Sequence, residues 1–312
     1  MDSSVDLTLA EYQRLAKLTD RIPTEDESSV NPKLVALLGL AGEIGTLLAG
    51  YKKHLRDGSA YELFPSNVQE ELGDILWYLA SAATKFDLPL ERIAESNIAK
   101  VTDRWPSQQE KSRLKRTAEA HFDALCTPKE QLPREFEVEI RPVEDPDSPE
   151  PKIQVVWNGK VVGDPLGDNT YDDSGYRFHD VFHLANAAVL GWSPVARGKL
   201  FERKRKSDAR LDSVEDGGRA IVVEEGFAAY VFEYGRHHNY LDCVTSLDYQ
   251  VLRTFRTLTS GLEVQARPLW EVEEAIFQGF AVWRQIKSAG GGLLRGNLTD
   301  RTLVCVQDSD SA

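Results

Sequence analysis

The sequence predicts a mainly α-helical protein, in which an N-terminal all-α helical bundle is followed by a small β-hairpin region and a second, mostly helical domain. Apolar residues recur at helical spacing through 9–105, and the same spacing returns from Tyr176 onward. Between these segments, 136–140 alternates apolar and charged residues, which is typical of a strand.

The chain has 312 residues, about twice the length of one usual domain. We therefore expect two domains and place their boundaries where composition and periodicity change. The expected segments are a helical N-terminal domain (1–106), a helical linker (107–130), a C-terminal α+β, mostly helical domain (131–307) and a disordered tail (308–312).

The helices of the N-terminal domain have recognisable start signals. Thr8 and Glu11 have the spacing of a capping box. Asn31-Pro32 begins a second helix that reaches about His54, with proline at the tolerated first position. Further helices are expected from Pro65 to about Phe86 and from Asp87 to about Trp105, and the charged segment 107–125 predicts one more, exposed helix.

The second half of the chain begins with strand signals and continues with helices. Asn158-Gly159 joins the apolar runs 153–157 and 160–162, which is a strong hairpin signal. We expect a short closing strand at 303–306. The expected helices are 176–190, 212–239, 244–260 and 269–287.

The composition excludes several classes of protein. Acidic residues outnumber basic ones by 50 to 37, which gives a net charge of −13 and disfavours nucleic acid or a membrane surface as a partner. Three separated cysteines (Cys126, Cys243, Cys305) fit a reducing cytoplasm. The apolar run Leu34 to Gly42 is too short to span a bilayer, and the acidic amino end is no signal peptide. We therefore expect a cytoplasmic protein.

Acidic side chains enter two apolar helices of the first domain. Glu71 and Asp74 are three residues apart on one helix face, and Glu43 interrupts the apolar run of the preceding helix. Burying like charges together is unfavourable unless a cation compensates them, and Mg²⁺ prefers carboxylate oxygens. The alternative is a solvated helix edge, with Glu70 also in water.

Basic residues flank the acidic segments. Asn97, Lys100 and Arg104 follow one stripe of the fourth predicted helix, and Lys53 and Arg56 close the second. Two cations and an amide on one stripe can hold phosphates. A solvated basic face is the alternative for any single member.

Four segments together resemble the MazG-type, all-α nucleotide pyrophosphohydrolases. They are Leu38-Gly-Leu-Ala-Gly-Glu43, Lys52-Lys53 with Arg56-Asp-Gly58, Glu70-Glu-Leu-Gly-Asp-Ile-Leu-Trp-Tyr-Leu79, and Asn97-Ile-Ala-Lys100 with Arg104. The resemblance covers residues 5–105. It implies a helical bundle completed by a second subunit, so a homodimer or higher homo-oligomer. It also implies cleavage of (deoxy)nucleoside triphosphates to monophosphate and pyrophosphate with Mg²⁺, or alternatively Mn²⁺.

The family's four metal-binding acids map onto this sequence with one departure. Glu43, Glu71 and Asp74 match the first, third and fourth acids and are the expected catalytic and metal-binding residues. Thr46 replaces the second acid, and Glu70 is the nearest substitute ligand. The loss of one charge places the second metal ion in doubt.

The resemblance also frames the alternatives. Proteins that combine such a domain with others are associated with nucleotide-pool clean-up and anti-phage defence. The leading hypothesis is a nucleoside triphosphate pyrophosphohydrolase. A nucleotide-binding sensor with weak or no turnover, controlling a C-terminal effector domain, is the alternative that Thr46 motivates.

The second half carries its own candidate site. His179 and His183 are four residues apart on one helix face, a spacing that can chelate a transition metal, and Glu224 and Glu225 interrupt an apolar helix. These residues could form a separate metal-dependent hydrolase. Alternatively, both histidines are hydrogen-bonded core residues. This half resembles the domain that accompanies some MazG-type domains, which implies no particular activity.

Overall fold

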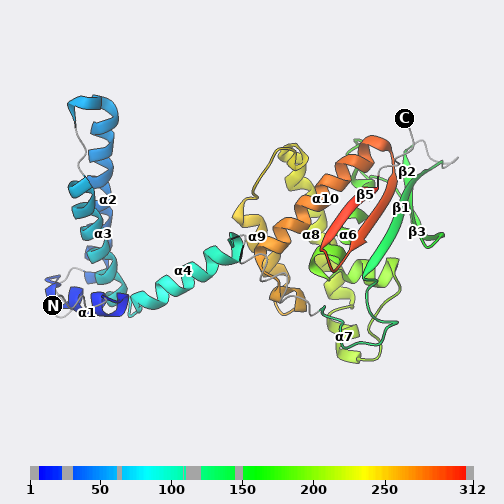
Figure 1. Cartoon of the computed structure of the whole chain (residues 1–312), viewed down its shortest axis with the longest axis horizontal. Coiled ribbons are helices and arrows are strands. Elements are labelled where there is room, and N and C mark those ends of the chain that lie inside the picture. The colour runs from blue at the N-terminus through cyan, green and yellow to red at the C-terminus, as the bar shows by residue number, and fades with distance from the viewer. Residues whose placement is uncertain are drawn as a thin grey trace. The chain divides into compact units, whose positions relative to one another are not determined.

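The structure is a computed structural model, and it describes residues 7–22, 31–61, 65–107, 109, 121–144 and 150–306. The chain divides into two compact units, Met1–Thr102 and Asp103–Ala312. The described residues are mainly helical, which confirms the predicted class (Figure 1). The domain boundaries expected at 106 and 130 stay predictions, and the tail 308–312 lies outside the described residues.

The first unit contains helices only among its described residues. They are α1 (Leu9–Thr19), α2 (Pro32–Asp57), the short 3-10 helix η1 (Gly58–Ala60), α3 (Pro65–Lys85) and α4 (Leu90–Arg104), which continues into the second unit. The predicted caps are present: Oγ1 of Thr8 accepts a hydrogen bond from the backbone N–H of Glu11 at 3.1 Å, and Asn31 accepts one from that of Lys33 at 2.9 Å. Each cap satisfies a backbone donor that the first helical turn leaves free.

The buried core of the first unit is small. Ala16 of α1, Ala80 and Ala83 of α3 and Leu90 of α4 form its centre. Polar contacts add to it, because Asp20 accepts a hydrogen bond from Lys85 at 2.6 Å at the end of α1. So few buried apolar side chains leave much of each helix surface unpacked by the unit itself.

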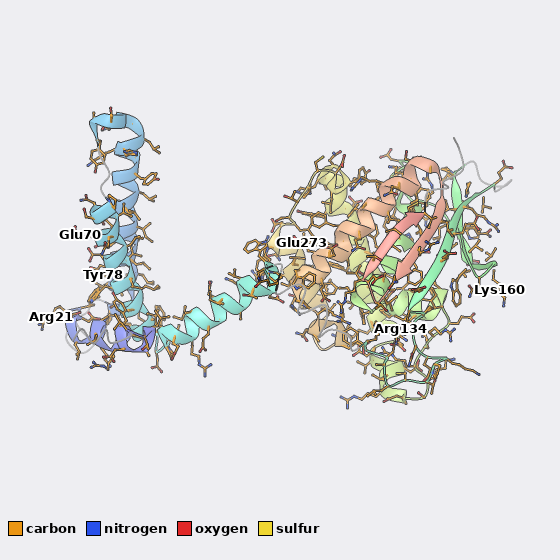
Figure 2. All side chains as sticks on the ribbon, viewed as in Figure 1. Arg21, Glu70, Tyr78, Arg134, Lys160 and Glu273 are labelled. Atoms are coloured by element: carbon orange, nitrogen blue, oxygen red, sulfur yellow. The ribbon has the colours of Figure 1, made fainter. Side chains whose placement is uncertain are left out.

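Helices α2 and α3 approach closely at one glycine. A Cβ atom at Gly39 would overlap the ring of Tyr78, which lies on α3 (Figure 2). By contrast, a Cβ atom at Gly42 or Gly45 would meet no other atom within 4 Å. Gly39 is therefore required for packing, whereas its two neighbours in the sequence motif are not.

Large apolar side chains remain exposed on α2. Leu37, Ile44, Leu48, Tyr51 and Leu55 are 42–75% exposed, and their spacing places them on one face of the helix. By length and composition, the segment Pro32–Ala60 could also cross a membrane. A core helix of a soluble bundle has the same composition, so one such helix is weak evidence for a membrane.

The second unit is built around a five-stranded antiparallel sheet of order β3-β2-β1-β4-β5. The strands are β1 (Glu135–Val143), β2 (Lys152–Trp157), β3 (Lys160–Leu166), β4 (Gly292–Asn297) and β5 (Thr302–Val306). The predicted hairpin and closing strand are confirmed, and Asn158 and Gly159 have the positive φ values of a two-residue turn. The prediction of only a small hairpin region is wrong, because the sheet has five strands and β4, from late in the sequence, pairs with β1.

Helices cover this sheet. The described elements are the 3-10 helix η2 (Tyr176–Phe178), α6 (Asp180–Ala185), the π-helical turns η3 (Asn186–Leu190) and η4 (Ala196–Leu200), α7 (Ala209–Val214), α8 (Gly218–His237), η5 (Asn239–Leu241), α9 (Tyr249–Leu258), η6 (Glu263–Ala266) and α10 (Leu269–Ala289). Helix α10 packs against α6 and β5, so apolar side chains from both layers form one core (Figure 1).

Three predicted helices need correction. The helix expected at 212–239 is two helices, because Gly217 is extended and Asp216 beside it is buried in an ion pair with Arg205. The helix expected at 244–260 begins only at Tyr249, where Asp248 provides the N-cap. The end of the helix expected at 107–125 is a series of turns from residue 121; residues 108 and 110–120 lie outside the described residues.

Buried ion pairs fasten the turns to the helices of the second unit. Asp123 accepts hydrogen bonds from Arg197 at 2.8 Å and from the backbone N–H of Leu132 at 2.7 Å. Arg205 pairs with Asp216 at 2.7 Å and Glu263 at 2.8 Å, and it is 1% exposed. These side chains carry their charges in the interior because each charge is paired and hydrogen-bonded.

Candidate functional sites

Four acidic side chains of the first unit lie close enough to interact. Partial burial, followed by the negative charges of Glu43, Asp74 and Glu70, raises the pKa of Glu71 above its ordinary value. One carboxylate oxygen of Glu71, Oε2, is buried and has no hydrogen-bond partner. Helices α2 and α3 therefore present a carboxylate that is held among like charges and lacks a donor.

The members of this acidic group differ in exposure. Glu43 and Glu71 are half-buried, whereas Asp74 and Glu70 are exposed. Glu70 is labelled on α3 in Figure 2. The exposed Thr46 uses its hydroxyl within its own helix, donating to the backbone oxygen of Gly42 at 3.3 Å. Among the described residues, the ligand atoms of this group are not within 4.8 Å of one another as a set of three.

Some of the candidate phosphate-binding residues lie together in one surface groove, and the others do not. Asn97 and Lys100 of α4 line a surface groove of 380 Å³ together with Leu88, Pro89 and Arg92. This groove places an amide and an ammonium side by side at the surface, as the predicted stripe requires.

The remaining cations have other contacts. Lys53 lies over the ring of Tyr61, with Nζ 6.0 Å from its centroid, and Arg56 pairs with Asp57 at 2.6 Å. Arg104 belongs to the second unit, where it donates to the backbone oxygen of Leu247 at 2.9 Å. Arg104 thus stabilises the second unit. The phosphate-binding role of Lys53, Arg56 and Arg104 stays a prediction.

The second half brings its predicted residues into one cluster. His179 precedes α6 and His183 lies on it, with ring centroids 5.8 Å apart. His183 is fully buried and lies between two carboxylates of α8: its Nδ1 is 3.1 Å from Oε1 of Glu224, and its Nε2 is 3.2 Å from Oε2 of Glu225. The two glutamates therefore occupy opposite edges of one imidazole.

The two glutamates have different environments. Glu224 is 1% exposed and also accepts hydrogen bonds from Asn186, Ser193 and the backbone N–H of Val195. Glu225 is 31% exposed at its side chain and pairs with Lys199 at 2.9 Å. Glu224 is thus enclosed by donors behind His183, whereas Glu225 faces the solvent side.

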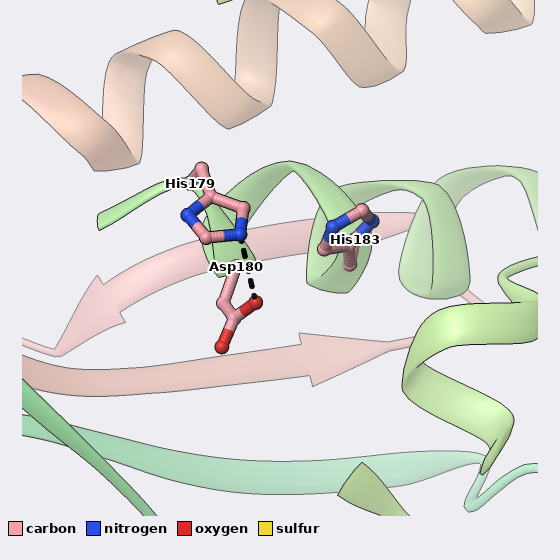
Figure 3. Close-up of side chains that lie close together, drawn as sticks. All are labelled: His179, Asp180 and His183. Carbon is pink, nitrogen blue, oxygen red and sulfur yellow. Dashed lines mark ion pairs between the residues drawn. The ribbon is translucent and has the colours of Figure 1, made fainter. Parts of the chain in front are cut away.

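Asp180 is the member that sequence reasoning missed. Its Oδ1 lies 3.6 Å from Nε2 of His179, and ligand atoms of His179, Asp180 and His183 all lie within 4.8 Å of one another (Figure 3). The i, i+4 spacing directed attention to the histidines. The adjacency of Asp180 to His179 was the available signal, because a residue beside the first histidine at a helix start can turn toward the same point.

Burial and charge act in opposite directions on the histidines. Burial lowers the pKa of His183, but Glu224, Glu225 and Asp180 outweigh it and raise the pKa to about 10. The hydrogen bond from His183 lowers the pKa of Glu225 to about 2. Burial lowers the pKa of His179, which Asp180 opposes only in part. Without a metal ion, a charged His183 thus compensates its two carboxylates.

Comparison with known proteins identifies the family of this second half. Residues 117–309 match the family described as the MazG C-terminal domain. The chain belongs to this family. It is also 33% identical, over 96 residues, to the Gene 37 protein of Mycobacterium phage L5; the match covers 30% of this chain and 84% of that protein. No solved structure matches the chain.

Proposed function

We propose that the first unit is a Mg²⁺-dependent nucleoside triphosphate pyrophosphohydrolase, with Mn²⁺ as an alternative ion. The observation that carries the proposal is the partnerless, partly buried carboxylate of Glu71, whose pKa is raised by burial and by Glu43, Asp74 and Glu70. The membership of the second half in a MazG-related family supports a nucleotide-related function for the whole chain.

The donor chemistry of these residues suits a hard cation, which would draw the separate carboxylates toward one point. Glu43, Glu71 and Asp74 would hold it, with Glu70 as a further ligand, because Mg²⁺ takes carboxylate oxygens and keeps positions for water and phosphate. When bound, Mg²⁺ neutralises charge on the triphosphate oxygens. Burial and then the repulsion of Glu43, Asp74 and Glu70 raise the pKa of Glu71, and such a cation would offset both unfavourable effects on its charged form.

The chain's own residues would position the other reactants. Lys53 and Lys100 would bind the two phosphates that leave, and Asn97 would donate to a phosphate oxygen. Oε2 of Glu71 would accept a proton from the attacking water, since it has no donor of its own. The water oxygen forms a bond to the α-phosphorus, the bond to the bridging oxygen breaks, and pyrophosphate leaves.

A second copy of the chain would complete this unit. The apolar stripe of α2 (Leu37, Ile44, Leu48, Tyr51 and Leu55) is exposed along the whole helix. Two identical stripes can cover each other across a twofold axis, which closes the assembly without leaving a free apolar face. This supports a homodimer or a higher homo-oligomer as the active form, and it accounts for the apolar composition of α2 without a membrane.

The proposal is tested by pyrophosphate release from a panel of ribo- and deoxyribonucleoside triphosphates with Mg²⁺ or Mn²⁺. The wild type should release pyrophosphate, and Glu71→Gln should reduce the rate by at least about 100-fold, the scale of losing one essential catalytic group. Glu91→Gln, on the exposed face of α4, is the matched control and should retain the wild-type rate.

The sensor alternative gives a different result in the same panel. It predicts tight binding of an intact triphosphate with Mg²⁺ and no pyrophosphate release. Equal activity in Glu71→Gln and the wild type would reject the assignment of the acidic site. A role in nucleotide clean-up or defence would follow from the substrate that the panel identifies.

A further inference from the structure

The cluster at the start of α6 has the dimensions of a metal site. A metal ion about 2.1 Å from each donor holds adjacent donors about 3.0–3.4 Å apart and opposite donors about 4.2 Å apart. Oε2 of Glu225 lies 3.2 Å from Nε2 of His183 and 4.0 Å from Nε2 of His179. Oδ1 of Asp180 lies 3.6 Å from Nε2 of His179. These three separations lie between the adjacent and opposite spacings or close to them. His179, Asp180 and His183 form the group whose ligand atoms all lie within 4.8 Å of one another, and Glu225 adjoins this group through its contacts with the two histidines.

Each imidazole has a protein oxygen atom close to its Nδ1 atom, on the side of the ring away from Nε2. Nδ1 of His179 lies 3.0 Å from the backbone oxygen of Tyr176, and Nδ1 of His183 lies 3.1 Å from Glu224. The backbone oxygen at Nδ1 of His179 fixes the tautomer that leaves its Nε2 free to bind a metal, which is the usual support of metal-binding histidines. Glu224 stands beside Nδ1 of His183 as an ion-pair partner without hydrogen-bond geometry, so it holds this ring by charge. The Nε2 atoms of both histidines approach Glu225.

The charge of the cluster suits a divalent cation. Asp180, Glu224 and Glu225 contribute three negative charges and Lys199 one positive charge, so two negative charges remain when both imidazoles are neutral. Imidazole donors favour first-row transition metals over Mg²⁺, which prefers oxygen ligands only. The side chains of His179, Asp180 and Glu225 are 15%, 17% and 31% exposed, so an ion has access from solvent.

We propose that His179, Asp180, His183 and Glu225 bind one divalent transition-metal ion of the zinc type, with Glu224 as a positioning residue. The site belongs to the second unit and shares no residue with the acidic cluster of the first. It is therefore independent of the proposed triphosphate hydrolysis, which uses oxygen ligands only.

The test uses the full chain carrying Glu71→Gln, which weakens the acidic site as a competing binder, in the presence of excess Mg²⁺. After treatment with a chelator and dialysis against Zn²⁺, elemental analysis should find one zinc per chain, and titration should give its affinity. His179→Ala and Asp180→Asn should each weaken zinc binding by at least about tenfold. Co²⁺ in place of Zn²⁺ should give an absorption spectrum that His179→Ala removes.

A surface histidine of the same unit provides the control. His237→Ala removes an exposed histidine at the end of α8 and should leave stoichiometry and affinity unchanged. If circular dichroism shows that His179→Ala does not fold, Asp180→Asn tests the proposal, because asparagine keeps the shape of the aspartate side chain. Absence of zinc from the wild-type cluster at micromolar free Zn²⁺, or unchanged affinity in Asp180→Asn, would overturn the proposal.

Discussion

Nε2 of His183 lies 3.2 Å from Oε2 of Glu225, a residue 42 positions later in the chain. This contact fastens α6 to α8 in the interior of the second unit. Because His183 is fully buried and also borders Glu224, its removal would take a shared imidazole from two carboxylates, leaving Glu224 with its donors Asn186, Ser193 and the N–H of Val195 and Glu225 with Lys199. The residue therefore supports the fold as well as the proposed metal site, and Asp180→Asn is the more selective probe of binding.

The departure at Thr46 gives a prediction about metal affinity. Thr46→Glu restores an acid three residues after Glu43 on the same helix face, so Mg²⁺ should bind at least several-fold more tightly. Isothermal titration with Mg²⁺ measures the change. Thr46→Gln has nearly the same size without the charge and should bind as the wild type does. Equal affinity in Thr46→Glu and Thr46→Gln would place position 46 outside the metal site.

The packing of α2 on α3 gives a prediction about stability. Gly39→Ala forces a methyl group into the ring of Tyr78, so it should lower the free energy of unfolding of the first unit by about 1–3 kcal/mol. Gly42→Ala and Gly45→Ala meet no other atom and should instead stabilise the helix by up to about 1 kcal/mol. Chemical denaturation of the three variants compares them; a Gly39→Ala variant as stable as Gly45→Ala would contradict the packing.

The buried pair of Asp123 and Arg197 gives a prediction about acid stability. Burial would raise the pKa of Asp123, but Arg197, the N–H of Leu132 and Arg134 outweigh it, so the pKa lies below 3.8. A carboxyl with a lowered pKa stabilises the fold above its unfolded pKa, and this contribution disappears as the pH falls from there through the folded pKa. Asp123→Asn should therefore cost about 3 kcal/mol at pH 7 and progressively less below pH 3.8.

Unfolding of the second unit at several pH values measures this difference. Asp242→Asn changes an exposed aspartate of the same unit and is the control, expected to behave as the wild type does. If the difference between Asp123→Asn and the wild type were the same at pH 7 and below pH 3.8, the assigned pKa direction would be wrong.

The apolar stripe of α2 gives a prediction about assembly. Leu48→Glu places a charge in the middle of the stripe, so the expected homo-oligomer should dissociate in sedimentation analysis. Val222→Glu changes a residue of the second unit that is 71% exposed and should leave the assembly intact. Unchanged sedimentation of Leu48→Glu would exclude α2 as the interface.

Local signals in the sequence predicted local structure well. The caps at Thr8 and Asn31, and the Asn158-Gly159 turn, follow from side-chain hydrogen bonds and backbone preferences that act over a few residues, and all are present. The pairing of β1 with β4 joins residues such as Val138 and Leu294, and no local pattern encodes a partner that distant. The predicted sheet was therefore smaller than the five-stranded sheet of the structure.

The candidate sites show the same limit. Periodicity placed His179 and His183 on one face, and the structure brings their rings together. Periodicity could not distinguish the environments of Glu224 and Glu225, because these environments depend on Ser193 and Lys199, which come from other elements. Asp180 stands three residues before His183, a spacing that also places two side chains on one helix face, but only the i, i+4 pair of histidines was interpreted as a metal-binding pattern.

The central claim is that water attacks the α-phosphorus of a nucleoside triphosphate at the acidic site. Hydrolysis in ¹⁸O-labelled water, followed by mass spectrometry of the products, tests it most directly. We predict that the nucleoside monophosphate carries one ¹⁸O atom, that pyrophosphate carries none, and that Glu71→Gln forms both products at least about 100-fold more slowly. Recovery of intact triphosphate, or of nucleoside diphosphate with labelled orthophosphate, would contradict the claim.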